Sequence, residues 1–181
     1  MSTVKPSSKI PSFAVEQWMD EYETTPNVLN LAETCVASIA IDDLVRLNSK
    51  KQLAASPVDY SIPMTYGAIR GSSALRDNIA GLYGASPRST QSTSGTITQE
   101  DVIVTSGAIS ANYLVIYSLV EAGDHVICVY PTYQQLYSVP ASLGADVSLW
   151  KLTAAGAFMP DVSELERLIR PNTKVCGLAQ V

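Results

Sequence analysis

The clearest pattern of apolar and polar positions along the chain lies in the stretch Asp101–Pro131. Val102 to Thr105 is a short β-branched apolar run, Ser106 to Ala108 is a turn of small residues, and Ile109 to Val120 repeats apolar residues at helical spacing. A second apolar run follows from His125 to Tyr130. A strand, a tight turn, a helix and a strand in this order predict two parallel strands joined by a crossover helix.

The small-residue turn before the helix predicts an anion site. A helix that begins directly after such a turn presents backbone N–H groups that lack intrahelical acceptors, together with the positive end of its dipole. Phosphate is the usual ligand of such helix starts. The sequence therefore predicts that backbone amides after Thr105 bind a phosphate group.

The rest of the chain alternates helical and extended patterns, which favours an α/β fold class. Ser12 is expected to cap the first helix, and Asp161 with Glu164 resembles a capping box for the last one. We expect helices over residues 13–23, 41–54, 72–83, 133–143 and 161–169, and further strands over residues 145–150 and 174–178.

Composition limits the classes of function. The chain has 181 residues, 46% of them hydrophobic, which is enough for one sizeable core. Its 17 acidic and 12 basic side chains argue against nucleic-acid or anionic-membrane partners. No segment approaches the roughly 20 apolar residues of a membrane span, so we expect a cytoplasmic protein. Three distant cysteines and one histidine predict no metal site, disulfide framework or histidine-based triad.

Five short motifs occur in one order along the chain. They are Tyr66 before Gly71, Leu75-Arg76, T-S-G-A-I-S-A-N at 105–112, A-G-D-H-V at 122–126 and P-T-Y at 131–133. Together they resemble the N-terminal half of the class I/II aminotransferases, which are fold-type I enzymes that depend on pyridoxal 5'-phosphate (PLP). L-A-E at 31–33 is also similar to a segment of the 1-aminocyclopropane-1-carboxylate synthase-like branch.

The resemblance covers about residues 10–181 and implies an architecture. It implies the N-terminal part of a three-layer α/β/α large domain with a mostly parallel sheet, preceded by a helical N-terminal segment. Residues 1–60 would be the arm and the small-domain portion, and residues 61–181 an incomplete PLP-binding domain. The run at 85–98 is rich in Ser and Thr and would be an exposed loop. Intact relatives are homodimers that bind an amino-acid substrate and an oxo-acid acceptor.

The resemblance also assigns the phosphate-binding residues. Gly107, Ala108 and Ile109 would hold the cofactor phosphate through backbone amides, and Ser106 or Ser110 would add a hydroxyl group. Because the contact is made by the backbone, the isoleucine side chain at position 109 is no obstacle.

Three further residues receive roles from the resemblance. Tyr133 would stack on the pyridine ring of the cofactor. Tyr66 would reach the phosphate of the neighbouring subunit, and Glu33 would lie near the substrate if the synthase-like match holds. The alternatives are that Tyr133 is an ordinary core aromatic residue and that Tyr66 is a loop tyrosine.

The sequence lacks the segments that supply catalysis in the family. These carry an Asn-Pro-rich turn, an Asp paired with the pyridine nitrogen, the Lys that forms the Schiff base, and an Arg that binds the substrate carboxylate. We therefore expect no catalytic residue in this chain and no activity from it alone. Three functions stay open: a truncated aminotransferase, a PLP-dependent lyase catalysing C–S or β/γ-elimination, and a non-catalytic remnant that binds a partner.

Overall fold

The computed structural model describes residues 3–4, 6, 9–32, 35–47, 58–84 and 97–177. They form two compact units, the first made of Met1–Leu29 with Val104–Val181 and the second of Asn30–Ile103. Glu33, and residues 85–96 of the predicted Ser/Thr-rich loop, lie outside the described residues. The first unit carries the predicted phosphate turn, and the second carries Tyr66.

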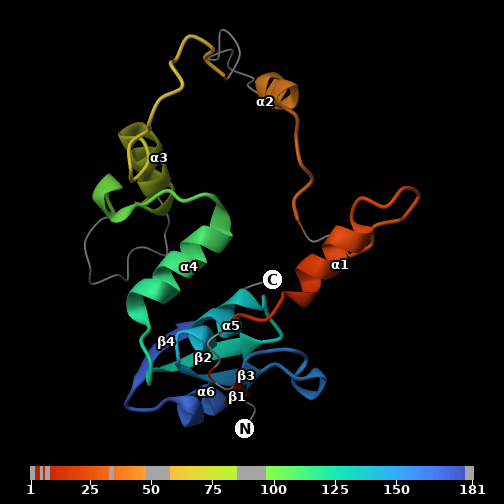
Figure 1. The fold of residues 1–181 in the computed structure, drawn as a ribbon, viewed down its shortest axis with the longest axis vertical. Helices are drawn as coiled ribbons and strands as arrows, with labels where there is room; N and C mark the ends of the chain where they lie inside the picture. The colour runs from red at the N-terminus through yellow and green to blue at the C-terminus, as the bar shows by residue number, and fades with distance from the viewer. Residues whose placement is uncertain are drawn as a thin grey trace. The chain divides into compact units, whose positions relative to one another are not determined.

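The predicted helices, and the predicted strands from residue 125 onward, are present in the predicted order with shifted ends (Figure 1). The strand at Thr3–Val4 was not predicted, and residues 48–54 of the predicted helix over 41–54 lie outside the described residues. The first unit contains β1 (Thr3–Val4), α1 (Ala14–Tyr22), α4 (Gly107–Leu119), β2 (His125–Tyr130), α5 (Gln135–Ser142), β3 (Asp146–Lys151), η3 (Ala154–Gly156), α6 (Val162–Leu168) and β4 (Thr173–Gly177). The second unit contains α2 (Ile41–Leu47), α3 (Ser73–Gly84) and η2 (Gln99–Asp101).

The sheet of the first unit has the strand order β1-β3-β2-β4. β2 is parallel to both of its neighbours, with Val126 opposite Val147 of β3 and Val175 of β4. β1 adds an antiparallel pair at the outer edge of β3. The crossovers between the parallel strands run through α5 and α6 (Figure 1). The predicted α/β class with a mostly parallel sheet is confirmed.

The predicted pairing of residues 102–105 with β2 is wrong. Residues 102–105 belong to no strand, although Val102 has extended backbone angles, φ −112° and ψ 131°. A strand has two edges, and those of β2 are occupied by β3 and β4. The apolar run therefore correctly indicated extended backbone, but the strand that pairs with β2 comes from later in the chain.

Side chains of β2 alternate between the two faces of the sheet, as strand geometry requires. Val126 and Cys128 pack with one core cluster, whereas Ile127 packs with another. The first cluster includes Ile116 of α4 and Val120 at the C-terminal end of that helix, together with Val139 and Ala141 of α5. The second includes Leu168 of α6. Helices thus cover both faces of the sheet, which is a three-layer arrangement.

Helix α1 is not capped by Ser12 as predicted. Its N-cap is Phe13, whose side chain makes no cap hydrogen bond. The amide of Ala14 instead donates to Oε1 of Gln134 at 3.2 Å, and Gln134 lies 120 positions later in the chain. At α6, the Asp161 half of the predicted capping box is present, because this carboxylate accepts a hydrogen bond from the Ser163 amide at 2.9 Å.

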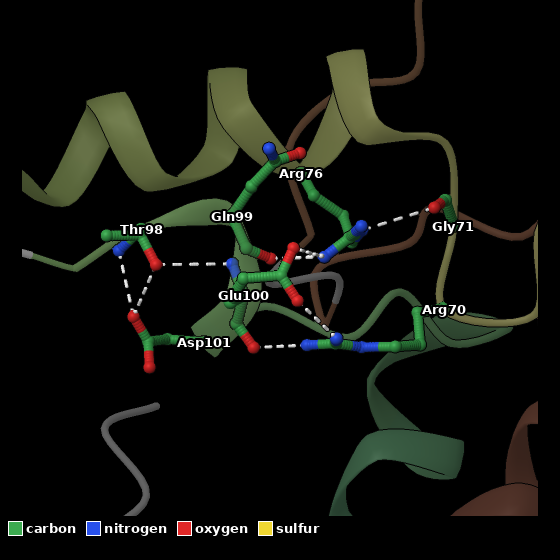
Figure 2. Close-up of polar contacts among 7 residues, drawn as sticks. All are labelled: Arg70, Gly71, Arg76, Thr98, Gln99, Glu100 and Asp101. Carbon is green, nitrogen blue, oxygen red and sulfur yellow. Dashed lines mark hydrogen bonds and ion pairs between the residues drawn. The ribbon is translucent and has the colours of Figure 1, made fainter.

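In the second unit, Arg76 and Glu100 connect α3 with η2 (Figure 2). The Arg76 guanidinium donates to the backbone oxygens of Gln99 and Gly71 and lies 3.6 Å from the Glu100 carboxylate. Arg70 forms a 2.7 Å ion pair with the same carboxylate. Arg76 is buried, so these partners compensate the cost of removing its charge from water. These contacts give Arg76 of the Leu75-Arg76 motif a structural role.

His125 joins three strands and gives a testable pH dependence. Its buried ring contacts Thr173 Oγ1 of β4 at 2.7 Å and Ser148 Oγ of β3 at 2.9 Å. Burial lowers the pKa of His125 from the usual 6.5, and the charge of Arg170 lowers it further against the opposing effect of Asp146. The unfolded chain therefore binds a proton at a higher pH than the folded chain does.

We predict that the free energy of unfolding falls as the pH drops below 6.5, because protonation then favours the unfolded state. Denaturant titrations across this pH range measure the effect. His125→Gln should be less stable but should lose this part of the pH dependence. An unchanged pH slope in the variant would contradict the assignment.

Gly107 has a positive φ of 82°, and a Cβ added there would meet no atom within 4 Å. Backbone conformation, rather than lack of space, therefore favours glycine at this position. Gly81, inside α3, also has open space around it but has no positive φ.

Alanine at these two glycines should have opposite effects on stability. Gly107→Ala should destabilise the protein by about 1–2 kcal/mol, because an L-residue is strained at this φ. Gly81→Ala should stabilise α3 by up to about 1 kcal/mol, because alanine is the better helix former. Thermal unfolding of both variants provides the comparison, and equal shifts in one direction would count against the strained turn.

Candidate functional site

The first turn of α4 presents backbone amides at the predicted anion site. Ser106 is the N-cap and makes no side-chain cap hydrogen bond. The Gly107 amide donates to Thr105 O at 2.9 Å and is therefore occupied. The amides of Ala108 and Ile109 follow, at positions where an α-helix supplies no acceptor for them. These residues are exposed, so a ligand can approach the helix start from solvent.

Hydroxyl groups hold the shape of this turn. Thr105 Oγ1 donates to Gly107 O at 3.0 Å, and Ser110 Oγ donates to Ser106 O at 2.9 Å. The Ser110 proton is therefore committed to the backbone. Of the two serines that the sequence suggested as hydroxyl donors, Ser106 is the better placed, since it is the exposed N-cap residue.

A buried glutamine connects the start of α4 with the start of α5. Gln135 is 3% exposed; its Nε2 donates to Ile109 O at 2.7 Å, and its Oε1 accepts from Asn112 Nδ2 at 3.2 Å. Gln135 follows Tyr133 by two residues along the chain. The segment that carries the predicted ring-stacking tyrosine is thus tied to the first turns of α4.

Tyr133 is partly exposed and contacts the N-terminal segment. Its hydroxyl donates to Glu16 Oε1 at 2.7 Å, and its ring lies 5.6 Å from that of Phe13 at an angle of 88°. Burial, followed by the hydrogen bond and charge of Glu16, raises the pKa of Tyr133 to about 12. The phenol is therefore neutral at physiological pH, and it differs from an ordinary interior aromatic residue because part of its surface stays accessible.

A mainly apolar pocket of about 530 Å³ lies beside this region. Ile10 and Phe13 of the N-terminal segment line it together with Thr105, Ile109 and Ser110 around the start of α4, and with Gln135. Thr105 and Ile109 bring the turn to the edge of this pocket, whereas Gly107, Ala108 and Tyr133 are not among its lining residues. The side-chain donors of Thr105, Ser110 and Gln135 have the backbone acceptors given above.

The other two predicted site residues lie outside this region of the first unit. Tyr66 lies in the second unit, and its side chain is fully exposed. Its contact with the phosphate of a neighbouring subunit stays a prediction. Glu33 lies outside the described residues, and its substrate role also stays a prediction.

Within the described part of the chain, no three His, Cys, Asp or Glu side chains are grouped so that they could hold a metal ion. No helix there combines the length and the apolar character needed to cross a membrane.

Sequence reasoning missed Glu16, Gln134 and Gln135. Gln134 and Glu16 act across 117 to 120 positions of the chain, so no local pattern marks their contacts. Gln135 lies two residues after Tyr133 of the P-T-Y motif, and an amide side chain at the start of a mainly apolar helix was the available signal.

Comparison with known proteins identifies the family of the chain. The family model for aminotransferases of class I and II matches residues 51–179. An arginine–pyruvate transaminase of Pseudomonas aeruginosa is 31% identical over 113 residues, which are 62% of this chain and 27% of that protein. The chain thus spans about a quarter of the length of this curated relative.

Solved structures show the same relationship. A PLP-dependent aminotransferase from Streptococcus suis is 36% identical, with a TM-score of 0.73 over 93% of this chain and 42% of its own. Escherichia coli YbdL, described as having a methionine aminotransferase function, is 32% identical, with a TM-score of 0.52 over 62% of this chain and 28% of its own. The sheet and its helices therefore match part of the fold-type I aminotransferase fold, and the chain belongs to the class I and II aminotransferase family.

Proposed function

We propose that this chain is the cofactor-binding part of a PLP-dependent aminotransferase that acts on an amino acid. The observation that carries the proposal is the exposed first turn of α4. The amides of Ala108 and Ile109 have no hydrogen-bond acceptor within this helix, and a pocket lies beside the turn. When bound, PLP serves as an electron sink for bonds at the substrate α-carbon.

The α4 start suits the phosphate group. Ala108 and Ile109 would donate backbone hydrogen bonds to phosphate oxygens, and Ser106 would add its hydroxyl. Charge-assisted hydrogen bonds of this kind are stronger than neutral ones. The positive end of the helix dipole contributes a further ~0.3–2 kcal/mol per anionic group. No lysine or arginine is required, which fits a turn built of small and apolar residues.

Tyr133 suits the cofactor ring. A neutral phenol offers a flat apolar face, and its polar end is already satisfied by Glu16. The ring can therefore stack without leaving a buried hydroxyl group unpaired. Gln135 ties this segment to Ile109, so a cofactor that touches both places would meet a preorganised site.

The family membership supports a proposal for the substrate class and the assembly. The relatives named above act on different amino acids, so we propose an amino-acid donor and an oxo-acid acceptor without assigning a side chain. Tyr66, exposed in the second unit, would complete the phosphate site of a second copy in a homodimer. Catalysis would be a property of the enzyme that contains the remaining family segments, whereas cofactor binding belongs to this chain.

Binding is tested by titrating the chain with PLP and following the quenching of tryptophan fluorescence. We predict saturable binding that inorganic phosphate competes away. Ala108→Pro removes one amide donor in a helix turn that tolerates proline, and it should weaken binding about tenfold or more.

Val162→Pro is the matched control, because Val162 is the exposed first residue of α6 and far from α4 in the topology. It should leave PLP affinity unchanged. Equal affinity of Ala108→Pro and the unaltered chain would show that the α4 amides do not hold the phosphate.

A further inference from the structure

The first turn of α1 rests on Tyr133 and Gln134. The Tyr133 hydroxyl donates to Glu16 Oε1 at 2.7 Å, while the Phe13 ring meets the tyrosine ring at 88°. The hydrogen bond fixes the tip of the side chain, and the aromatic contact restricts the ring plane. Two independent contacts from the start of α1 therefore limit rotation about both χ1 and χ2 of Tyr133.

Gln134 holds α1 in the position that these contacts require. Its Oε1 accepts from the Ala14 amide at 3.2 Å, and its Nε2 donates to Ser12 O at 3.1 Å and Pro11 O at 3.4 Å. The side chain thus caps a helix that has no cap of its own. Glu16 thus reaches Tyr133 from a helix start that is itself hydrogen-bonded to Gln134, the residue after Tyr133.

We propose that Glu16 is a positioning residue, which orients the ring of Tyr133 for contact with the pyridine ring of PLP. This inference rests on the proposed function and adds a residue to it. Glu16 does not touch the cofactor in this proposal; it acts through the tyrosine.

The physical basis is preorganisation. An exposed tyrosine samples several orientations, and fixing one of them at the moment of binding costs conformational entropy. A short hydrogen bond to a carboxylate keeps the ring in one orientation before the cofactor arrives. The neutral phenol is the donor, so this bond is lost when the phenol ionises. The raised pKa of Tyr133 places that loss well above physiological pH.

The first arm of the test follows the ionisation of Tyr133, which needs no cofactor. Carbon-13 labelled tyrosine reports the titration by NMR, and Tyr133→Phe identifies the signal. Glu16→Ala should move the Tyr133 pKa from about 12 back toward 10, and Glu16→Gln should move it part of the way. Glu23→Gln, which changes the same charge at the other end of α1, should not move it. A Tyr133 pKa that is unchanged in Glu16→Ala would overturn the proposal.

The second arm measures PLP affinity in a double-mutant cycle. Glu16→Ala should weaken binding by about two- to tenfold, the range expected for one hydrogen bond. In the Tyr133→Phe background, where the hydrogen bond is already absent, Glu16→Ala should have no further effect. An equal loss in both backgrounds, or no loss in either, would overturn the positioning role. Failure of the unaltered chain to bind PLP would instead refute the proposed function, and this inference with it.

Discussion

The hydrogen bonds of the buried Gln135 side chain are the interaction on which the candidate site depends. They join Ile109 O in the first turn of α4 to the beginning of α5, and so they relate the proposed anion-binding turn to the segment that carries Tyr133. A buried amide without these partners would cost about 1–3 kcal/mol for each unsatisfied group, so the arrangement is strongly favoured once the core has formed. The sheet sets the positions of both helices, because the core cluster that includes Val126 and Cys128 packs against them.

In the proposed phosphate site, the positive electrostatic potential would come from the backbone. The chain has a formal net charge of −5, and several of its arginines are paired in the structure: Arg70 and Arg76 with Glu100, and Arg170 with Asp146. Helix α4 and the lining of the pocket beside it contain no lysine or arginine, so an anion bound there would be held by amides and a helix dipole. The fold fixes the positions of these donors, because backbone amides do not change rotamer as lysine side chains do. This also explains why an isoleucine at position 109 is compatible with binding a charged group.

The sequence predicted those features that depend on local patterns. The turn before α4, the buried strand β2 and the Asp161 cap are all encoded within a few residues, and the structure contains each of them. Features that depend on tertiary contacts were not predictable. Residues 102–105 have strand character, but the two edges of β2 are taken by β3 and β4. The cap of α1 comes from Gln134, and the partner of Tyr133 is Glu16; both contacts cross more than a hundred positions, where spacing carries no information.

The central claim is that the amides of Ala108 and Ile109 bind the phosphate group of PLP. The most direct measurement is a titration of the nitrogen-15 labelled chain with PLP, and with inorganic phosphate in parallel, while the amide signals are followed by NMR. We expect saturable downfield shifts of these two amide protons with both ligands, and an additional change at the Tyr133 ring with PLP alone. Binding that leaves these two amides unshifted, with the perturbed signals elsewhere in the chain, would contradict it.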